Sequence, residues 1–262
     1  MYTGPIRRSL LCPLAMRGCG RHAIRVSYEG NNGDVFLQVF TGAPVRELAA
    51  GETLFQAGER AEQVFNIVSG TLMVGRIGKD GRRQVMSFLF KNNFVGLTSA
   101  DHYFFSVEAV TRAQVSYRSR QTLETHLRAN SAAERTFRDM VLRVLENSLD
   151  LVYSLGQRTA IERLAVFLLY LRHRHRISAG ITDDRDRSLD TIDLPMSRQD
   201  IADFLGLKKE TVSRSFTELD NRGLIGRPGS RHAVIERLVE LRELAGVTDF
   251  ASPLRGVVPH TS

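Results

Sequence analysis

The spacing of apolar positions changes along the chain and predicts its main elements. Between residues 34 and 122, short apolar runs are separated by glycine-containing turns. Many short strands at nearly even spacing favour an antiparallel roll or barrel. The predicted strands lie in the runs Val35–Phe40, Thr53–Phe55, Val64–Val68, Thr71–Val74, Gln84–Leu89 and Ser106–Val110.

From about residue 120 the apolar spacing becomes helical. One stripe has the 4, 3, 4, 3, 4 spacing of a heptad seam. It consists of Phe137, Val141, Val144, Ser148, Leu151 and Leu155. A second stripe consists of Leu142, Leu145, Leu149 and Val152. A helix of about thirty residues with two stripes is longer than a lone domain usually needs. One stripe can pack on the roll while the other meets a partner, so we predict a parallel dimerisation helix that ends at Gly156, with the first stripe as its interface. A purely intramolecular helix is the alternative.

The C-terminal part alternates short helices with extended segments. A turn and a short strand follow a compact pair of helices, and they predict a two-stranded wing. The expected elements are a helix at Thr159–His173, an extended segment at Ser188–Met196, two helices within Ser197–Leu219, a turn at Ile225–Arg231, a strand at His232–Ile235 and a helix at Glu236–Leu244.

The pair of helices within Ser197–Leu219 has the pattern of a helix-turn-helix unit. Ser197 can cap the first helix, and Asp200 stands where its carboxylate can reach back to the cap. Gly206 permits the left-handed backbone of a sharp turn. The side chains expected to face inward are Ile201, Phe204, Leu205, Leu207, Val212, Phe216 and Leu219.

Polar side chains are left on the outer face of the second helix. Glu210, Ser213 and Arg214 fall at i, i+3 and i+4, so they share one face. Arginine can bind guanine, glutamate can accept from cytosine, and serine can meet thymine. The alternative is an ordinary amphipathic pair with a solvated charged face. Candidate phosphate contacts are Ser197, Arg198, Gln199, Lys208, Lys209 and Thr211.

Composition adds limited information. The chain is 42% hydrophobic and 25% charged, as in ordinary soluble globular proteins, and no apolar run approaches the roughly 20 residues of a membrane span. We therefore expect a cytoplasmic protein with no membrane partner. The net charge is +7, but residues 1–28 alone hold five arginines and no acid. The segment Lys208–Arg231, with six Lys/Arg against three acids, is the better indication of a polyanionic partner.

Several motifs resemble one family. The segment IADFLGLKKETVSRSFTELDNRGLI resembles the C-terminal domain of the CRP/FNR superfamily of bacterial transcription regulators, and its Glu210–Arg214 core is similar to that family's recognition-helix signature. With serine at position 213, the recognition helix resembles that of the FNR and FixK branch. LGQRTAIERLAVFLL resembles that branch's hinge and following helix. The stretches GETLFQAGE, VSGTL and DGRRQV resemble turns of the cyclic-nucleotide-binding roll.

The resemblance implies an α+β fold with an N-terminal cyclic-nucleotide-binding-like antiparallel β-roll, a long dimerisation helix and a C-terminal winged helix-turn-helix. It also implies a homodimer that binds a TTGA-type palindrome through Glu210, Ser213 and Arg214, activates transcription and contacts RNA polymerase. The expected regions are a basic flexible tail at 1–30, the roll at 31–124, the dimerisation helix at 125–156, the DNA-binding domain at 157–245 and a second tail at 246–262.

The roll departs from the nucleotide-binding pattern. The stretch Phe94–Val110 keeps Gly96, but Leu97 stands where those members have a ribose-binding glutamate, and no arginine lies between Lys91 and Arg112. A cyclic phosphate would lack its charge-assisted partner. Cys12 and Cys19 are too few for a four-cysteine cluster and lack zinc spacing. We therefore expect no cofactor and no metal, and the FixK type of regulator that acts without a small effector.

Two alternatives remain open. A ligand-sensing member could hold haem and respond to nitric oxide, with candidate ligands His22, His102, His126, His173 and His175. A cupin-like metalloenzyme would need several histidines and a carboxylate in the roll. The only histidine between residues 34 and 122 is His102, so the sequence predicts that the protein is not an enzyme.

Overall fold

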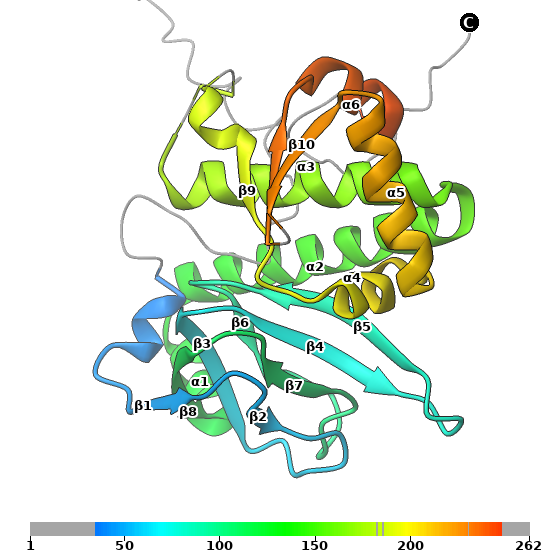
Figure 1. The fold of residues 1–262 in the computed structure, drawn as a ribbon. Coiled ribbons are helices and arrows are strands. Elements are labelled where there is room, and N and C mark those ends of the chain that lie inside the picture. Colours follow the sequence, from blue (N-terminus) through cyan, green and yellow to red (C-terminus); the bar gives the residue numbers. More distant parts are fainter. Residues whose placement is uncertain (1–34, 182, 185, 230, 248–262) are drawn as a thin grey trace, which may run out of the picture.

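Two four-stranded antiparallel sheets form the N-terminal half of the protein in the computed structural model, which describes residues 35–181, 183–184, 186–229 and 231–247 (Figure 1). The strand orders are β1-β8-β3-β6 and β2-β7-β4-β5. The tail predicted at 1–30, with Cys12, Cys19 and His22, lies outside the described residues, as does the tail predicted at 246–262 except for Gly246 and Val247. The strands are β1 (Val45–Leu48), β2 (Thr53–Phe55), β3 (Gln63–Ser69), β4 (Leu72–Ile77), β5 (Arg83–Leu89), β6 (Phe94–Val95), β7 (Ser106–Ala109) and β8 (Ala113–Ser119).

Side chains that alternate along these strands serve two cores. In β4, Leu72 and Val74 join the core between the two sheets, whereas Met73 points to the opposite face. In β5, Leu89 faces the inner core, and Phe88 joins the outer one. The sheet that contains β4 and β5 is therefore apolar on both faces, and its outer face requires a cover.

The segment Val35–Phe40 was predicted as a strand, and this prediction is wrong. Residues Leu37–Phe40 form a short 3-10 helix, η1. Phe36, Val39 and Phe40 are buried, a spacing of three and four that suits one helical face rather than a strand. The ring of Phe36 lies 5.1 Å from that of Phe94 and 5.5 Å from that of Phe137. The segment thus fills the space between the roll and the long helix.

The predicted dimerisation helix is divided in two. Helix α1 (Arg120–Ala129) ends one residue before Asn130, and helix α2 (Ser131–Gln157) begins one residue after it. The Asn130 side chain accepts hydrogen bonds of 3.1 Å from the backbone N–H groups of Ala132 and Ala133, which caps α2. Helix α2 ends one residue beyond the predicted end at Gly156.

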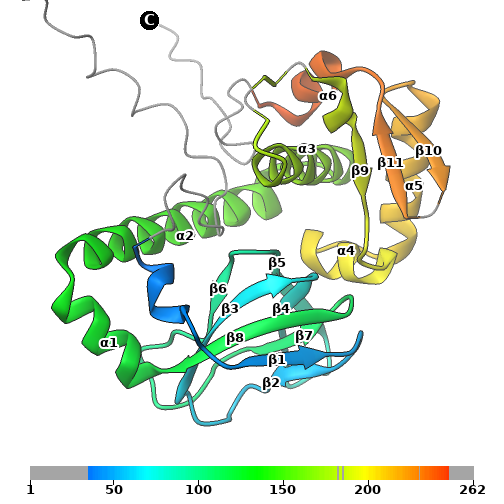
Figure 2. The same ribbon diagram turned by 90° about the vertical axis from the view of Figure 1, so that its left-hand side faces the viewer.

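The C-terminal part packs three helices and a small sheet against helix α3 (Figure 2). The sheet has the order β10-β11-β9, so the extended segment before the helix-turn-helix adds a third strand to the expected wing. The elements are α3 (Ala160–Ser178), the 3-10 helix η2 (Arg187–Asp190), β9 (Thr191–Asp193), α4 (Arg198–Leu205), α5 (Lys209–Asn221), β10 (Ile225–Gly229), β11 (His232–Ile235) and α6 (Leu238–Ala245).

The expected α+β architecture of roll, long helix and winged helix-turn-helix is confirmed. One continuous core joins the outer face of β4 and β5 to α3 and α4. The rings of Phe88, Phe167 and Phe204 meet there at centroid distances of 5.4 to 6.0 Å. The roll therefore contacts the helix-turn-helix unit directly. Among the described helices, none combines the length and apolar character needed to cross a bilayer.

Candidate nucleic-acid interface

Helix α4 starts at a complete capping box. The Ser197 hydroxyl accepts a hydrogen bond from the Asp200 backbone N–H at 3.1 Å, and the Asp200 carboxylate accepts one from the Ser197 backbone N–H at 2.9 Å. Both groups satisfy backbone donors that would otherwise be unpaired at the first turn. This confirms the predicted start of the helix-turn-helix unit.

The turn between α4 and α5 is made by Gly206. Its backbone lies in the left-handed region, with φ of 64°, and this conformation ends α4. A Cβ atom at this position would lie 3.1 Å from Cδ2 of Leu155 on α2. Glycine is therefore favoured both by the backbone conformation and by the close approach of the long helix.

Helix α5 has one buried and one exposed face. Val212, Phe216 and Leu219 are fully buried, as predicted, and they anchor α5 against α3 and α4. The opposite face exposes Glu210, Ser213 and Arg214 together. These three residues therefore share one outer face of α5, as expected.

The two charged base-reading candidates on α5 have no partners within the described chain, unlike Glu218 of the same helix, which pairs with Arg222. Neither Glu210 nor Arg214 takes part in a hydrogen bond or an ion pair among the described residues, so the i,i+4 pair that their spacing permits is not formed. Lys208 and Lys209 are also exposed, at the N-terminal end of α5, and Thr211 is half-buried. The outer face thus offers a carboxylate, a hydroxyl and a guanidinium to a ligand.

The three phosphate candidates on α4 are held in place by neighbours. The Ser197 hydroxyl belongs to the capping box, and the Gln199 amide donates to Asp203 Oδ1 at 2.6 Å. The Arg198 guanidinium carbon lies 3.5 Å from the ring centroid of Phe216, a cation–π contact that joins α4 to α5.

The environment of Arg198 favours an anion. Partial burial lowers the pKa of Arg198, and the nearby positive charge of Arg227 lowers it further. Arg227 itself pairs with Asp220, through bonds of 3.0 and 2.9 Å. A phosphate beside Arg198 would offset both effects, because it would restore favourable interactions to the charged guanidinium.

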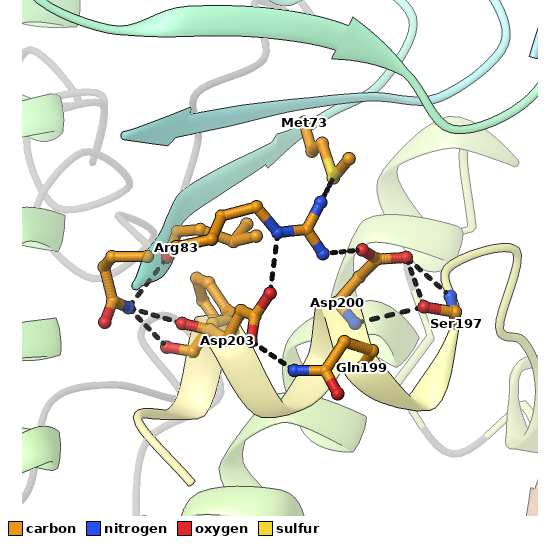
Figure 3. Close-up of polar contacts among 9 residues, drawn as sticks. Met73, Arg83, Ser197, Gln199, Asp200 and Asp203 are labelled. Atoms are coloured by element: carbon orange, nitrogen blue, oxygen red, sulfur yellow. Dashed lines mark hydrogen bonds and ion pairs between the residues drawn. The ribbon is translucent and has the colours of Figure 1, made fainter. Parts of the chain in front are cut away.

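Two residues of the roll that were not predicted as site residues, Arg83 and Gln84, contact α4 (Figure 3). Arg83 of β5 donates to Asp203 Oδ2 at 2.7 Å and also to the Asp200 carboxylate. Partial burial alone would lower the pKa of Arg83, but hydrogen bonds to Asp203 and Asp200 outweigh it and raise that pKa above its usual value. Gln84 donates to the backbone carbonyl of Asp203 at 2.6 Å. Nothing in the local sequence indicates these contacts, because the partners are more than a hundred residues apart.

The two apolar stripes of α2 have different surroundings. In the first stripe, Phe137 packs in the core beneath η1 and Leu151 packs against the core of the C-terminal part. Val141, Val144 and Ser148 of that stripe are exposed, and Leu155 is half-buried. The second stripe is exposed throughout, to 61% at Leu149 and 67% at Val152. The large exposed apolar side chains of α2 are Val141, Leu142, Val144, Leu145, Leu149, Val152 and Tyr153.

Aromatic side chains fill the interior of the roll. The ring of Phe55 stacks on that of Tyr103 at 3.8 Å and lies within 5.7 Å of the rings of Phe65 and Phe105. The Tyr103 hydroxyl donates to the Gln63 carbonyl at 2.7 Å. Leu97, at the position of the ribose-binding glutamate, packs against the core beneath η1.

Potential metal and haem ligands are dispersed. No group of three or more His, Cys, Asp and Glu side chains suited to a metal ion occurs within the residues that the structure describes. His102 and His175 are exposed, and His126 Nε2 lies 3.2 Å from the Val35 carbonyl oxygen. His173 is buried within α3.

Two family descriptions match the chain. Residues 45–130 match the cyclic nucleotide-binding domain, and residues 162–244 match the Crp-like helix-turn-helix domain. Together the two matches cover the roll, the first part of the helical region and the winged unit.

Named relatives agree with this assignment. The nitrogen fixation regulation protein FixK of Bradyrhizobium diazoefficiens is 33% identical over 68% of this chain and 72% of its own length. The transcriptional activatory protein AadR of Rhodopseudomonas palustris is 34% identical over 66% of this chain and 70% of its own. The structure of FixK2 from Bradyrhizobium japonicum aligns with a TM-score of 0.69 and 31% identity, over 77% of this chain and 96% of that one. These relatives are transcription regulators and not enzymes, so the chain belongs to the CRP/FNR superfamily of transcription regulators, in the branch that contains FixK.

Proposed function

We propose that this regulator is a homodimer that binds a palindrome with TTGA-type arms and activates transcription without a small-molecule effector. The observation that carries the proposal is the set Glu210, Ser213 and Arg214, which is exposed on one face of α5 and whose side chains pair with no other described residue. That face is presented by a helix whose opposite side is fully buried, so its direction is fixed.

The three side chains suit the base edges of such an arm. Arg214 can donate to guanine O6 and N7 together, Glu210 can accept from the cytosine amino group, and Ser213 can contact thymine. Ser197, Arg198, Gln199, Lys208, Lys209 and Thr211 would contact the flanking phosphates. Phosphate contacts hold the orientation of the unit on DNA, while the base contacts supply sequence preference.

A second copy of the chain is the proposed occupant of the exposed face of α2. A contiguous row of large apolar side chains on a soluble helix marks an association surface. We assign the interface to the exposed members Val141, Val144 and Ser148 of the first stripe together with the second stripe, Leu142, Leu145, Leu149 and Val152. Phe137 and Leu151 pack against the chain's own cores, and Leu155 is half-buried beside Gly206. A twofold axis along α2 would present two copies of α5 to two arms of one palindrome.

The interior of the roll supports independence from cyclic nucleotide. Stacked aromatic rings occupy the interior, and Leu97 offers no acceptor for a ribose hydroxyl. A bound cyclic phosphate would also lack an arginine in the stretch Phe94–Val110. Burial of its charge without a cation would be strongly unfavourable.

The names of the relatives support the proposed activation. AadR is named a transcriptional activatory protein, which supports an activator that contacts RNA polymerase. DNA and RNA polymerase would be met in the cytoplasm, which is the setting that we propose for this regulator.

The test is the binding of the purified full-length protein to a fluorescent TTGA-N6-TCAA duplex, compared with a duplex whose arms are scrambled. The arm centres in this operator are about 10 base pairs apart, one helical turn. We expect tight, arm-dependent binding in the absence of additive, and no change on addition of cyclic AMP. Equal binding to both duplexes would contradict the base contacts, and a requirement for cyclic AMP would contradict effector independence.

A further inference from the structure

The roll and the helix-turn-helix unit meet across an apolar contact. Met73, Val85 and Phe88 on the outer face of the roll share one core with α3 and α4. Such a contact is large but non-directional, because apolar burial depends on area and not on angle. It holds the two parts together and leaves their register to be set by other groups.

Directional contacts lie at the edge of this core. The Arg83 guanidinium spans two carboxylates one turn apart on α4, Asp200 and Asp203, whose side chains are only 14% and 12% exposed. Charge-assisted bonds from one planar fork to two acceptors fix angle as well as distance. Gln84 donates a further hydrogen bond to the Asp203 backbone carbonyl, near the C-terminal end of α4. Together these contacts set the position of α4 along β5.

The position of α4 determines the position of the DNA-reading face. Helices α4 and α5 are joined by the tight turn at Gly206 and by the contact of Arg198 with Phe216, so they move together. At the other side, the roll is fixed to α2 through the core that contains Phe94, Phe137 and Met140. A connected path therefore runs from the proposed twofold axis, through the roll and Arg83, to α5.

This path matters because a dimer must match two arms at once. Helix-turn-helix dimers bind half-sites about 34–36 Å apart, so their reading helices must be held at that separation. If the helix-turn-helix unit of each subunit is free to move, the dimer binds DNA less tightly, because binding must first order that unit. Such a dimer also binds operators whose two arms lie at other separations, because its two reading helices have no preferred separation before binding.

We propose that Arg83 is a positioning residue for DNA binding, which fixes α4 to the roll and thereby sets the operator spacing that the dimer accepts. The inference rests on the proposed homodimer and its palindrome. Arg83 touches no DNA in this account and acts through Asp200 and Asp203.

An electrostatic role must be separated from this one. Arg83 also neutralises Asp200 and Asp203, which lie beside the candidate phosphate contacts Ser197 to Gln199. Loss of that neutralisation would weaken the binding of every DNA to a similar extent, because phosphate repulsion is independent of sequence and spacing. A preference for one operator spacer, in contrast, depends only on the relative position of the two helix-turn-helix units in the dimer.

The experiment measures binding of full-length Arg83→Ala to TTGA-N6-TCAA and to duplexes whose spacer is one base pair shorter or longer. The wild type should prefer one spacer. The variant should lose about tenfold on that spacer, the scale of one charge-assisted hydrogen bond, and should lose little on the others, so that its preference is flattened. A fall of equal size on all spacers and on scrambled DNA would overturn the proposal.

Matched variants complete the design. Arg82→Ala removes the neighbouring arginine, whose side chain is 89% exposed and pairs with Asp80 inside the hairpin, and it should keep the wild-type preference. The charge reversal Arg83→Asp with Asp203→Arg should restore much of the spacing preference that Arg83→Asp alone removes. This charge-reversal pair also tests the proposal if Arg83→Ala does not fold. A double variant that folds but does not regain the spacing preference would count against the proposal. If the wild type itself does not distinguish the palindrome from scrambled DNA, the proposed function fails instead.

Discussion

Arg163 Nη1 donates a hydrogen bond of 2.9 Å to the backbone carbonyl of Leu205, at the last residue of α4. The same guanidinium donates to the carbonyls of Leu155 at 2.7 Å and Arg158 at 2.9 Å. One side chain thus joins the C-terminal ends of α2 and α4 to the first turn of α3. A helix leaves its last carbonyl groups without partners inside the helix, and Arg163 supplies donors to both ends.

Arg163→Ala should lower the free energy of unfolding by about 2–4 kcal/mol, because hydrogen bonds from a charged group are lost and partly buried carbonyls remain unpaired. Urea unfolding followed by circular dichroism measures the change. The exposed Arg138 of α2 supplies the control, since Arg138→Ala should have almost no effect. Arg163→Lys should recover only part of the loss, because an ammonium cannot reproduce the planar fork. Equal stability of Arg163→Ala and wild type would exclude this linking role.

Arg214→Ala should weaken binding to the palindrome by about 1–3 kcal/mol and relax selectivity at one base pair in each arm. The reason is that Arg214 is exposed beside Ser213 on the outer face of α5 and pairs with no side chain in the part of the protein that the structure describes. Fluorescence anisotropy on operators with single substitutions in the arms measures both effects. The contrast is Lys209→Ala, which should weaken all DNA binding alike and reduce the slope against salt concentration by about one. If Arg214→Ala also weakened all sequences alike, its role in base recognition would be refuted.

The sequence predicted the helix-turn-helix unit well because its determinants are local. Ser197, Asp200 and Gly206 each act on the backbone within a few residues of themselves, and the inward apolar positions follow one helical period. The long-range contacts could not be predicted in the same way. Nothing near Arg83 in the sequence distinguishes it from the exposed Arg82, since its partners lie on another part of the chain.

The helical region shows the same limit. The two stripes of α2 were visible from spacing, but their surroundings depend on where η1 and α3 pack. Phe137 faces Phe36 of a segment that resembled a strand in sequence, and this contact turns part of the first stripe inward. The break at Asn130 was missed because apolar spacing is insensitive to a cap.

Leu149→Glu should dissociate the proposed dimer, because it places a charge in the middle of the exposed apolar face of α2, where association would bury it without a partner. Sedimentation velocity over a range of concentrations measures the change, and binding to the palindrome should fall with it. Val239→Glu is the control. Val239 of α6 is 63% exposed, similar to Leu149, but lies outside the proposed interface. A sedimentation coefficient that Leu149→Glu leaves at the dimer value would place the interface elsewhere.

Gly206→Ala and Gly156→Ala should change stability in opposite directions, although both replace glycine by alanine at a helix terminus. At Gly206 the left-handed backbone costs an alanine about 1–2 kcal/mol, and its Cβ would lie 3.1 Å from Leu155. Gly156 lies inside the last turn of α2, and a Cβ atom there would meet no described atom within 4 Å apart from its chain neighbours and the nearby backbone of its own helix. Alanine at this position should stabilise the protein by roughly 0.5–1 kcal/mol, because it has the higher helix propensity. Thermal unfolding of the two variants gives the signs directly. Because Gly206 also sets the angle between α4 and α5, its variant should in addition bind the palindrome less tightly than Gly156→Ala, and equal affinity would show that the turn tolerates a side chain without moving the DNA-reading face.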